Sequence, residues 1–129
     1  MQELYCSGSQ LKVLNLTGLA KLTILDCSLN SLTFIDVSEL INLQNLNCSG
    51  NQLQTLNTND LTKLQSLNCS NNQLKALFIK NGTTEASLNF SGNPNLLFVC
   101  ADPSQVPSVQ SLITSYGYTS TVGSDCSLN

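Results

Sequence analysis

Cysteine is the residue type of this chain that could take part in the widest range of reactions, because a thiol can form a disulfide, bind a metal ion or act as a nucleophile. Four of the six cysteines recur every 21 residues: Cys6, Cys27, Cys48 and Cys69. If they point inward from parallel strands, they form a ladder of small, buried, unreactive side chains. Side chains in register meet the disulfide dihedral poorly, and stacked thiols do not converge tetrahedrally on a metal ion. We therefore interpret this ladder as structural.

Acid–base chemistry is disfavoured by the composition. The chain has no histidine, which is the commonest general base and the commonest zinc ligand. Its eight carboxylates are scattered along the sequence, and no two of them fall at the same outward strand position in neighbouring copies of the repeat described below. A pair of carboxylates that could act together as acid and base is therefore not expected. We predict that the protein is not an enzyme and uses no cofactor or metal.

Charge and hydropathy also limit the partners. The net charge is −3, and the five basic residues are all lysines without a basic stripe, so nucleic acid is not an expected partner. No apolar run approaches the roughly 18 to 20 residues that a bilayer requires, so membrane insertion is not expected either. The first ten residues, MQELYCSGSQ, show no pattern of a signal peptide.

The strands that would position the cysteines and carboxylates are predicted from an internal repeat of 21 residues. The copies are 1–21, 22–42, 43–63, 64–84 and 85–100, the last with one extra residue, and they share the pattern L-x-x-L-x-C-S-x-N-x-L-x-x-L. One copy cannot bury its apolar side alone, whereas stacked copies form a continuous core, so the copies are expected to associate along one axis. The alternation in L-x-x-L-x-C predicts one strand per copy, paired in parallel with its neighbours.

Two columns follow from that pairing. Leucines and cysteines point inward, ending in Phe90 where the fifth copy would have a cysteine. The asparagine of each copy marks where the strand turns away, and its amide can satisfy backbone groups left unpaired at the bend. We interpret this column as structural; it contains Asn30, Asn51, Asn72 and Asn93, with Ser9 in the first copy.

The pattern resembles the leucine-rich repeat over residues 1 to about 100, with cysteine in place of the third leucine as in internalin-like bacterial surface proteins. The resemblance implies an α/β solenoid: a right-handed superhelix with a parallel β-sheet on its concave face. In leucine-rich repeats the concave sheet commonly binds other molecules. We therefore expect a protein or glycan partner on that face.

The segment 101–129 reads as a C-terminal helical cap. Val106, Val109, Leu112, Ile113 and Tyr116 follow helical spacing, with Ser104 as the expected N-cap and Gly117 after the helix, followed by an extended piece from Tyr118 to Val122. Cys100 precedes the helix and Cys126 follows the extended piece; both lie outside the 21-residue ladder and are candidates for a disulfide, the alternative being two free thiols. The segment is also similar to the terminal cap of leucine-rich repeat regions in secreted and surface proteins of Bacteroidetes, which implies an extracellular or cell-surface location.

By strand position, the first two copies place apolar and charged side chains on the outward face, whereas later copies place asparagine and serine there. The irregular part is the expected contact region, because aromatic and aliphatic anchors supply most interface energy. The alternative is that Ile24 and Leu29 are ordinary isolated surface residues. The candidate binding residues are Tyr5, Ile24, Asp26, Leu29, Asn47, Asn68 and Asn89.

The function expected from the sequence is a non-enzymatic binding module of a bacterial secreted or surface protein, with adhesion as one role. A structural spacer or assembly segment is the alternative, and binding to an ordered surface such as ice or a polysaccharide is a remote one. The first copy begins at Met1, where the repeat has leucine, with no polar cap before it. We therefore expect an open N-terminal edge that pairs with upstream repeats of a longer protein or with a second copy.

Overall fold

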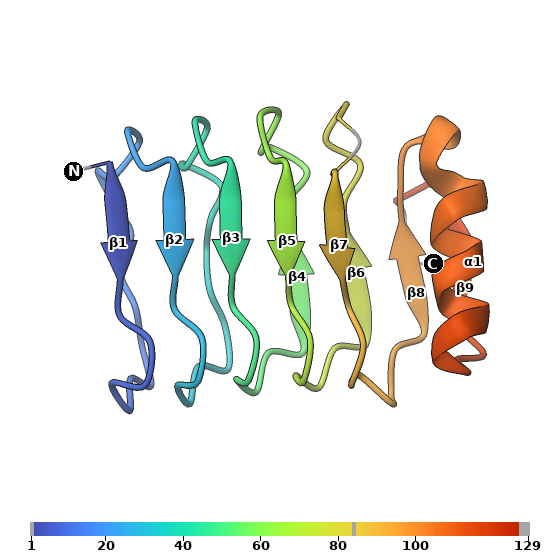
Figure 1. Ribbon diagram of the computed structural model, residues 1–129, viewed down its shortest axis with the longest axis horizontal. Coiled ribbons are helices and arrows are strands. Elements are labelled where there is room, and N and C mark those ends of the chain that lie inside the picture. The colour runs from blue at the N-terminus through green and yellow to red at the C-terminus, as the bar shows by residue number, and fades with distance from the viewer. Residues whose placement is uncertain (1, 84, 127–129) are drawn as a thin grey trace.

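The computed structural model describes residues 2–83 and 85–126, so the expectation about Met1 lies outside the described residues. Five short strands form a parallel sheet in the order β1-β2-β3-β5-β7, which we call sheet A (Figure 1). Its strands are β1 (Glu3–Tyr5), β2 (Ile24–Asp26), β3 (Asn45–Asn47), β5 (Ser66–Asn68) and β7 (Ser87–Asn89). Neighbouring strands pair residues 21 apart in the chain, as the sequence period predicts.

A second parallel sheet, sheet B, was not predicted. It has the order β4-β6-β8-β9, and it lies behind sheet A in Figure 1. Its strands are β4 (Thr55–Asn57), β6 (Ala76–Phe78), β8 (Phe98–Cys100) and β9 (Thr121–Gly123). The pairing of Ala76 with Phe98 spans 22 residues rather than 21, which locates the extra residue of the fifth copy between β7 and β8. Residues 13–15 and 34–36, at the positions equivalent to β4, form no strand.

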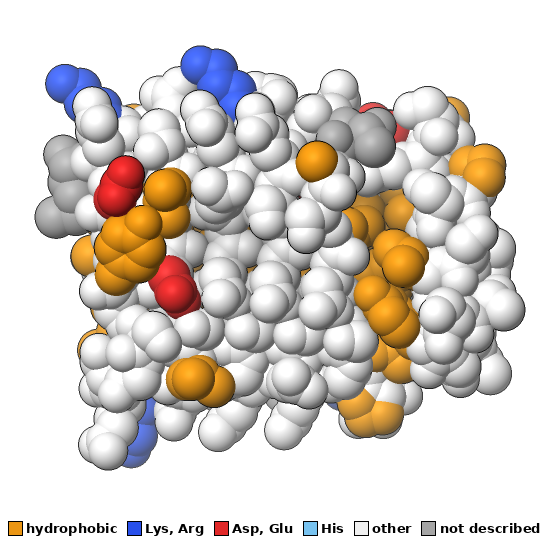
Figure 2. All heavy atoms as spheres, in the orientation of Figure 1, with side chains coloured by type: hydrophobic (Ala, Val, Ile, Leu, Met, Phe, Trp, Pro, Cys, Tyr) orange, Lys and Arg blue, Asp and Glu red, His pale blue; other side chains and the backbone are white. Residues whose placement is uncertain are grey.

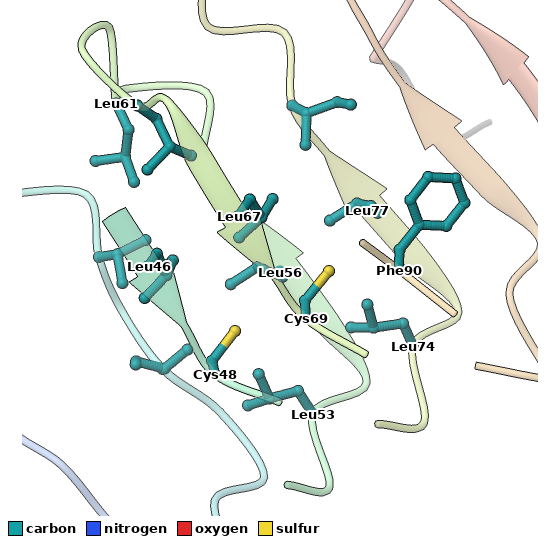
Figure 3. Close-up of a cluster of buried hydrophobic side chains, with 14 of the residues drawn as sticks. Leu46, Cys48, Leu53, Leu56, Leu61, Leu67, Cys69, Leu74, Leu77 and Phe90 are labelled. Atoms are coloured by element: carbon teal, nitrogen blue, oxygen red, sulfur yellow. The ribbon is translucent and has the colours of Figure 1, made fainter. Parts of the chain in front are cut away.

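Side chains from both sheets meet in one hydrophobic cluster (Figure 3). Leu46 and Leu67 come from sheet A, Leu56 and Leu77 come from sheet B, and all four are buried. In a short strand the residue at the centre faces inward while its two neighbours face outward, so a three-residue strand contributes one core side chain. The leucines of the connecting segments, such as Leu53 and Leu74, fill the remaining space and are also fully buried.

The asparagine column joins neighbouring copies through buried hydrogen bonds. Asn51 Nδ2 donates to the carbonyl oxygens of Cys27 and Cys48 at 3.0 and 3.1 Å, and its Oδ1 accepts from the backbone N–H of Leu32 at 3.0 Å. Asn30, Asn72 and Asn93 make the same kind of bonds to their own copy and to the copy before it. Backbone groups that the bend removes from the ladder are thereby paired.

The C-terminal end of the sheets is covered by one helix, α1 (Val106–Tyr116), which follows a 3₁₀ turn, η1 (Pro103–Gln105). Val109 and Ile113 of α1 are buried, and Gly117 ends the helix in the left-handed conformation that glycine adopts without strain. The expected N-cap at Ser104 is wrong, because that residue lies inside the 3₁₀ turn and α1 has no side-chain cap. The extended piece is the strand β9, which begins at Thr121, later than predicted.

Phe90 stands where the other copies have a cysteine, because the last strand of sheet A has no following strand to fill the space beside it. Its fully buried ring packs edge-to-face on Tyr116, with 5.0 Å between ring centroids. The Tyr118 hydroxyl donates to the Phe90 carbonyl at 3.0 Å and accepts from the Asn93 N–H at 2.8 Å. Asn93 makes the equivalent two bonds to the copy before it, among others, so Tyr118 replaces the asparagine of a further copy and ends the column.

A disulfide joins Cys100 of β8 to Cys126, with 5.3 Å between the Cα atoms, and ties the segment after β9 to sheet B. The pairing expected from the sequence is thus present, and the alternative of two free thiols is wrong for this pair. Within residues 2–83 and 85–126, no helix has the length and apolar character needed to cross a bilayer.

The opposite end of the core is less covered. Leu4, Cys6, Leu11, Leu14 and Leu19 are only partly buried, whereas the equivalent residues of the next copy are buried. An open N-terminal edge predicts that Leu16 of the first copy is partly uncovered too, but this residue is only 4% exposed. The Leu19 N–H donates to the Leu16 carbonyl at 3.2 Å, so the chain turns directly after Leu16, whose side chain belongs to the buried core cluster.

Replacing Asn51 with alanine should lower the free energy of unfolding by about 3 kcal/mol or more. The Leu32 N–H would remain buried without a partner, which costs about 1–3 kcal/mol. The Cys27 and Cys48 carbonyls would each lose one of two amide donors, since Asn30 and Asn72 still donate to them, and each lost bond costs about 1 kcal/mol more. Gln52→Ala is the matched control, since this neighbouring side chain is exposed and makes no hydrogen bond among the described residues. Urea denaturation measures both variants. Equal stability of the two variants would contradict the role assigned to the asparagine column.

Candidate functional site

The candidate binding residues gather over sheet A. A shallow depression of about 330 Å³ crosses all five strands of the sheet. Six of the seven candidates line it: Tyr5, Ile24, Asp26, Asn47, Asn68 and Asn89. Five of these, all except Ile24, form one column, because the parallel register pairs Tyr5 with Asp26 and continues through the three asparagines. Leu29 does not line the depression; it is 65% exposed, with its backbone left-handed (φ 55°).

Each asparagine of this column is held by its own copy. Asn68 Oδ1 accepts from the N–H and the hydroxyl of Ser70 at 3.1 and 2.7 Å. Asn47 and Asn89 accept the same pair of bonds from Ser49 and Ser91. The Nδ2 atoms of these three asparagines have no hydrogen-bond partner among the described residues. Sheet A therefore presents a row of oriented amide donors, one on each of three adjacent strands.

The serines of these copies were expected to form part of an outward asparagine and serine lattice. Ser28 and Ser70 are instead buried, and their hydroxyls donate to the residue two positions before them. The physical reason is that the chain bends directly after each strand, which folds the serine back onto its own strand. The amide groups of the asparagines are therefore free on the face, together with the hydroxyls of Ser66 and Ser87, which line the depression and have no hydrogen-bond partner among the described residues.

The N-terminal end of the column differs in chemistry. Asp26 replaces the asparagine, and its Oδ1 accepts from the N–H and hydroxyl of Ser28 at 3.0 and 2.6 Å in the same geometry. Tyr5 is 62% exposed, and its hydroxyl donates to Glu3 Oε1 at 3.3 Å. Partial desolvation and the neighbouring charge of Glu3 raise the pKa of Tyr5, so its hydroxyl stays protonated near neutral pH. Ile24 lies half-buried on the neighbouring strand.

Figure 2 shows this division of the face. The middle of the face, over β3 and β5, is white, whereas hydrophobic and acidic side chains gather over β1 and β2 and hydrophobic surface appears again beside β7. The row of amides can donate hydrogen bonds to a ligand rich in oxygen acceptors, and the aromatic ring at its end can contact an apolar face of the same ligand.

The ladder cysteines lie beneath the same sheet as free thiols. Cys27, Cys48 and Cys69 are fully buried, and Cys6, at the open end, is half-buried. Burial raises the pKa of Cys69 to about 12 and that of Cys48 well above its usual value. Burial, followed by the nearby Cys6 and Asp26, raises the pKa of Cys27 to about 12. These thiols therefore remain protonated and poorly nucleophilic at neutral pH.

Comparison of the chain with protein-family models matched none of them, and a search among curated proteins found no relative. Within the described residues, no three histidine, cysteine or acidic side chains are grouped so that they could hold a metal ion.

A second group of polar residues was not singled out from the sequence. Glu85 and Gln105 are buried between β7 and α1, at 7% and 3% exposure. The repeat pattern could have identified Glu85. It is the first residue of its copy, and the first residues of the three preceding copies, Leu22, Leu43 and Leu64, are buried. A carboxylate at a core position requires a specific partner or a function.

In the native protein, a thiol reagent at pH 8 should modify Cys6 first and leave Cys27, Cys48 and Cys69 unmodified until the chain unfolds. At a pKa of about 12, only about one thiol in ten thousand is ionised at this pH, and burial blocks access in addition. Peptide mapping by mass spectrometry identifies the modified residues, and the denatured chain, in which all four thiols react, is the control. Native modification of Cys48 as fast as Cys6 would refute the buried ladder.

Proposed function

We propose that the protein is a leucine-rich repeat module of a secreted or cell-surface bacterial protein, with the strands wound as a right-handed solenoid and sheet A on its concave face. The 21-residue register of sheet A and the hydrogen-bonded asparagine column support this architecture. The Cys100–Cys126 disulfide supports an extracellular location, because structural disulfides persist in oxidising compartments.

The proposed activity is non-enzymatic binding of a glycan on sheet A, as in adhesion. The observation that carries it is the row of Asn47, Asn68 and Asn89, whose Nδ2 donors point away from the internal bonds that fix each side chain. A glycan offers hydroxyl and ring oxygens along its length to such donors. A protein partner fits this part of the face less well, because aromatic and arginine anchors, which supply most protein interface energy, are lacking over β3, β5 and β7.

Asn68→Asp should weaken glycan binding at least tenfold while the protein stays folded. The substitution keeps the oxygen that accepts from Ser70, as Asp26 does for Ser28, but replaces the free donor with a charged acceptor. A glycan array identifies the ligand, and isothermal titration calorimetry compares the variants.

Asn57→Asp is the matched control for that experiment. Asn57 lies in sheet B, and its Oδ1 accepts from the Asn59 N–H at 2.9 Å, so the substitution makes the same change in charge and hydrogen bonding away from the proposed site. Equal binding by wild type and Asn68→Asp, or no glycan bound on the array, would refute the proposal.

A second candidate function is assembly through the free edge of β1. The Cys6 N–H donates to the Asp26 carbonyl and the Thr23 N–H donates to the Gln2 carbonyl, so the backbone groups of Glu3 and Tyr5 face away from β2. Beside this edge lie the partly buried Leu4, Leu11 and Leu14. An edge with unpaired strand groups and apolar surface can be covered by a second copy of the chain.

If this edge mediates assembly, the protein should dimerise with increasing concentration and Glu3→Pro should abolish the dimer. Proline removes the outward N–H at Glu3 without affecting the bonds to β2, and edge strands tolerate it. Glu3→Ala, which retains the N–H, is the control. Sedimentation equilibrium distinguishes the two variants, and a monomer at all concentrations would exclude self-assembly through β1.

A further inference from the structure

A groove of about 550 Å³ lies between β7, the last strand of sheet A, and helix α1. Its volume falls within the range of ligand pockets, about 300–1,000 Å³. Leu88 of β7 and Leu112 of α1, both half-buried, line it, and α1 adds the serines at 108, 111 and 115 at helical spacing. Figure 2 shows hydrophobic surface in the corresponding region, between the strands of sheet A and the helix.

The strand side of this groove has unpaired backbone groups. The Ser87 N–H donates to the Gln65 carbonyl at 3.2 Å, and the Asn89 carbonyl accepts from the Cys69 N–H at 2.9 Å, so the backbone groups of both residues face β5. In a parallel strand the residue between them faces the other way. The N–H and C=O of Leu88 therefore point away from β5, and no residue of the described chain pairs with them.

One end of the groove carries a buried negative charge without a cation. The Glu85 carboxylate accepts from Asn81 Nδ2 at 3.0 Å and from Gln105 Nε2, and both donors are neutral amides. Gln105 is 3% exposed, and its buried Oε1 has no hydrogen-bond partner among the residues that the structure describes. The described residues that line the groove include no lysine or arginine. Buried polar groups of native proteins are paired in the great majority of cases, so this end lacks a donor.

We propose that this groove binds an extended peptide segment that carries a lysine or arginine. The segment adds as a strand to β7 through the N–H and C=O of Leu88, as in recognition by β-strand addition. Its apolar side chain covers Leu88 and Leu112, and its cationic group donates to Gln105 Oε1 and to the Glu85 carboxylate, where a charge-assisted bond is stronger than a neutral one. This site is separate from the amide row on sheet A and does not depend on glycan binding.

A display library of random heptapeptides, panned against the whole chain, tests the proposal. The expected selection is one basic residue near β-branched or aromatic residues. A synthetic copy of the most enriched peptide should slow hydrogen exchange at the Leu88 amide. Replacing its basic residue with norleucine should weaken binding at least tenfold.

Variants of the protein locate the binding site. Glu85→Gln removes the charge and should weaken binding at least tenfold. Because a buried substitution can also disturb folding, Ser111→Lys provides a second measurement: this exposed serine lines the groove, and a lysine there should block it. Gln110→Lys is the control, since this exposed residue of α1 is outside the lining and adds the same charge.

Three results would overturn the proposal. The first is a library that yields no enriched peptide. The second is enriched peptides that bind Ser111→Lys as tightly as wild type. The third is peptide binding that is lost in Asn68→Asp rather than in Ser111→Lys. The last result would place the peptides on the face of sheet A. Retained glycan binding in Ser111→Lys, together with lost peptide binding, would show that the two sites act separately.

Discussion

The buried asparagine amide at each bend is the interaction on which the rest of the structure depends. Strands of three residues leave many backbone groups outside the ladders, and a buried group without a partner is costly. Asn51 and Asn72 pair such groups in their own copy and in the copy before it, so each copy is complete only in contact with a neighbour. The same contact between copies buries the leucine side chains. Hydrogen bonding and apolar burial therefore both favour a spacing of 21 residues.

The same requirement governs how the stack ends. Asn93 has no following asparagine, and its N–H would remain unpaired next to a buried core without the Tyr118 hydroxyl. Phe90 replaces the small thiol of the earlier copies because the helix, and not another strand, lies beside it. The capping segment thus supplies an apolar surface and a hydrogen-bond partner together, and the disulfide at Cys126 holds the end of that segment against sheet B.

The repeat allowed the register of sheet A, the inward leucines and the bonding role of the asparagines to be predicted, because these depend on residues that recur at one spacing. Sheet B escaped prediction because its strands, such as Thr55–Asn57 and Ala76–Phe78, share only a leucine at their centre. Ser104 satisfies local helix-capping rules, but the preceding Pro103 and the chain path from β8 favour a 3₁₀ turn there. Leu29 was misplaced because a left-handed backbone conformation redirects a side chain that strand alternation places on the face.

Asparagine serves two purposes in a copy, and the difference between them is the basis for the binding face that we propose. At the bend, the amide is buried and its donors and acceptor are all used. At the strand position, Asn68 and its equivalents use only the acceptor, through a serine that is itself held by the bend. The internal bond fixes the orientation of the side chain, so little conformational entropy remains to be lost when the free donor binds a ligand. The 21-residue spacing that stabilises the core therefore also sets the spacing of the amide donors. A ligand with repeating acceptors can bind several of these donors at once, so it gains more binding free energy from the face than a compact ligand does.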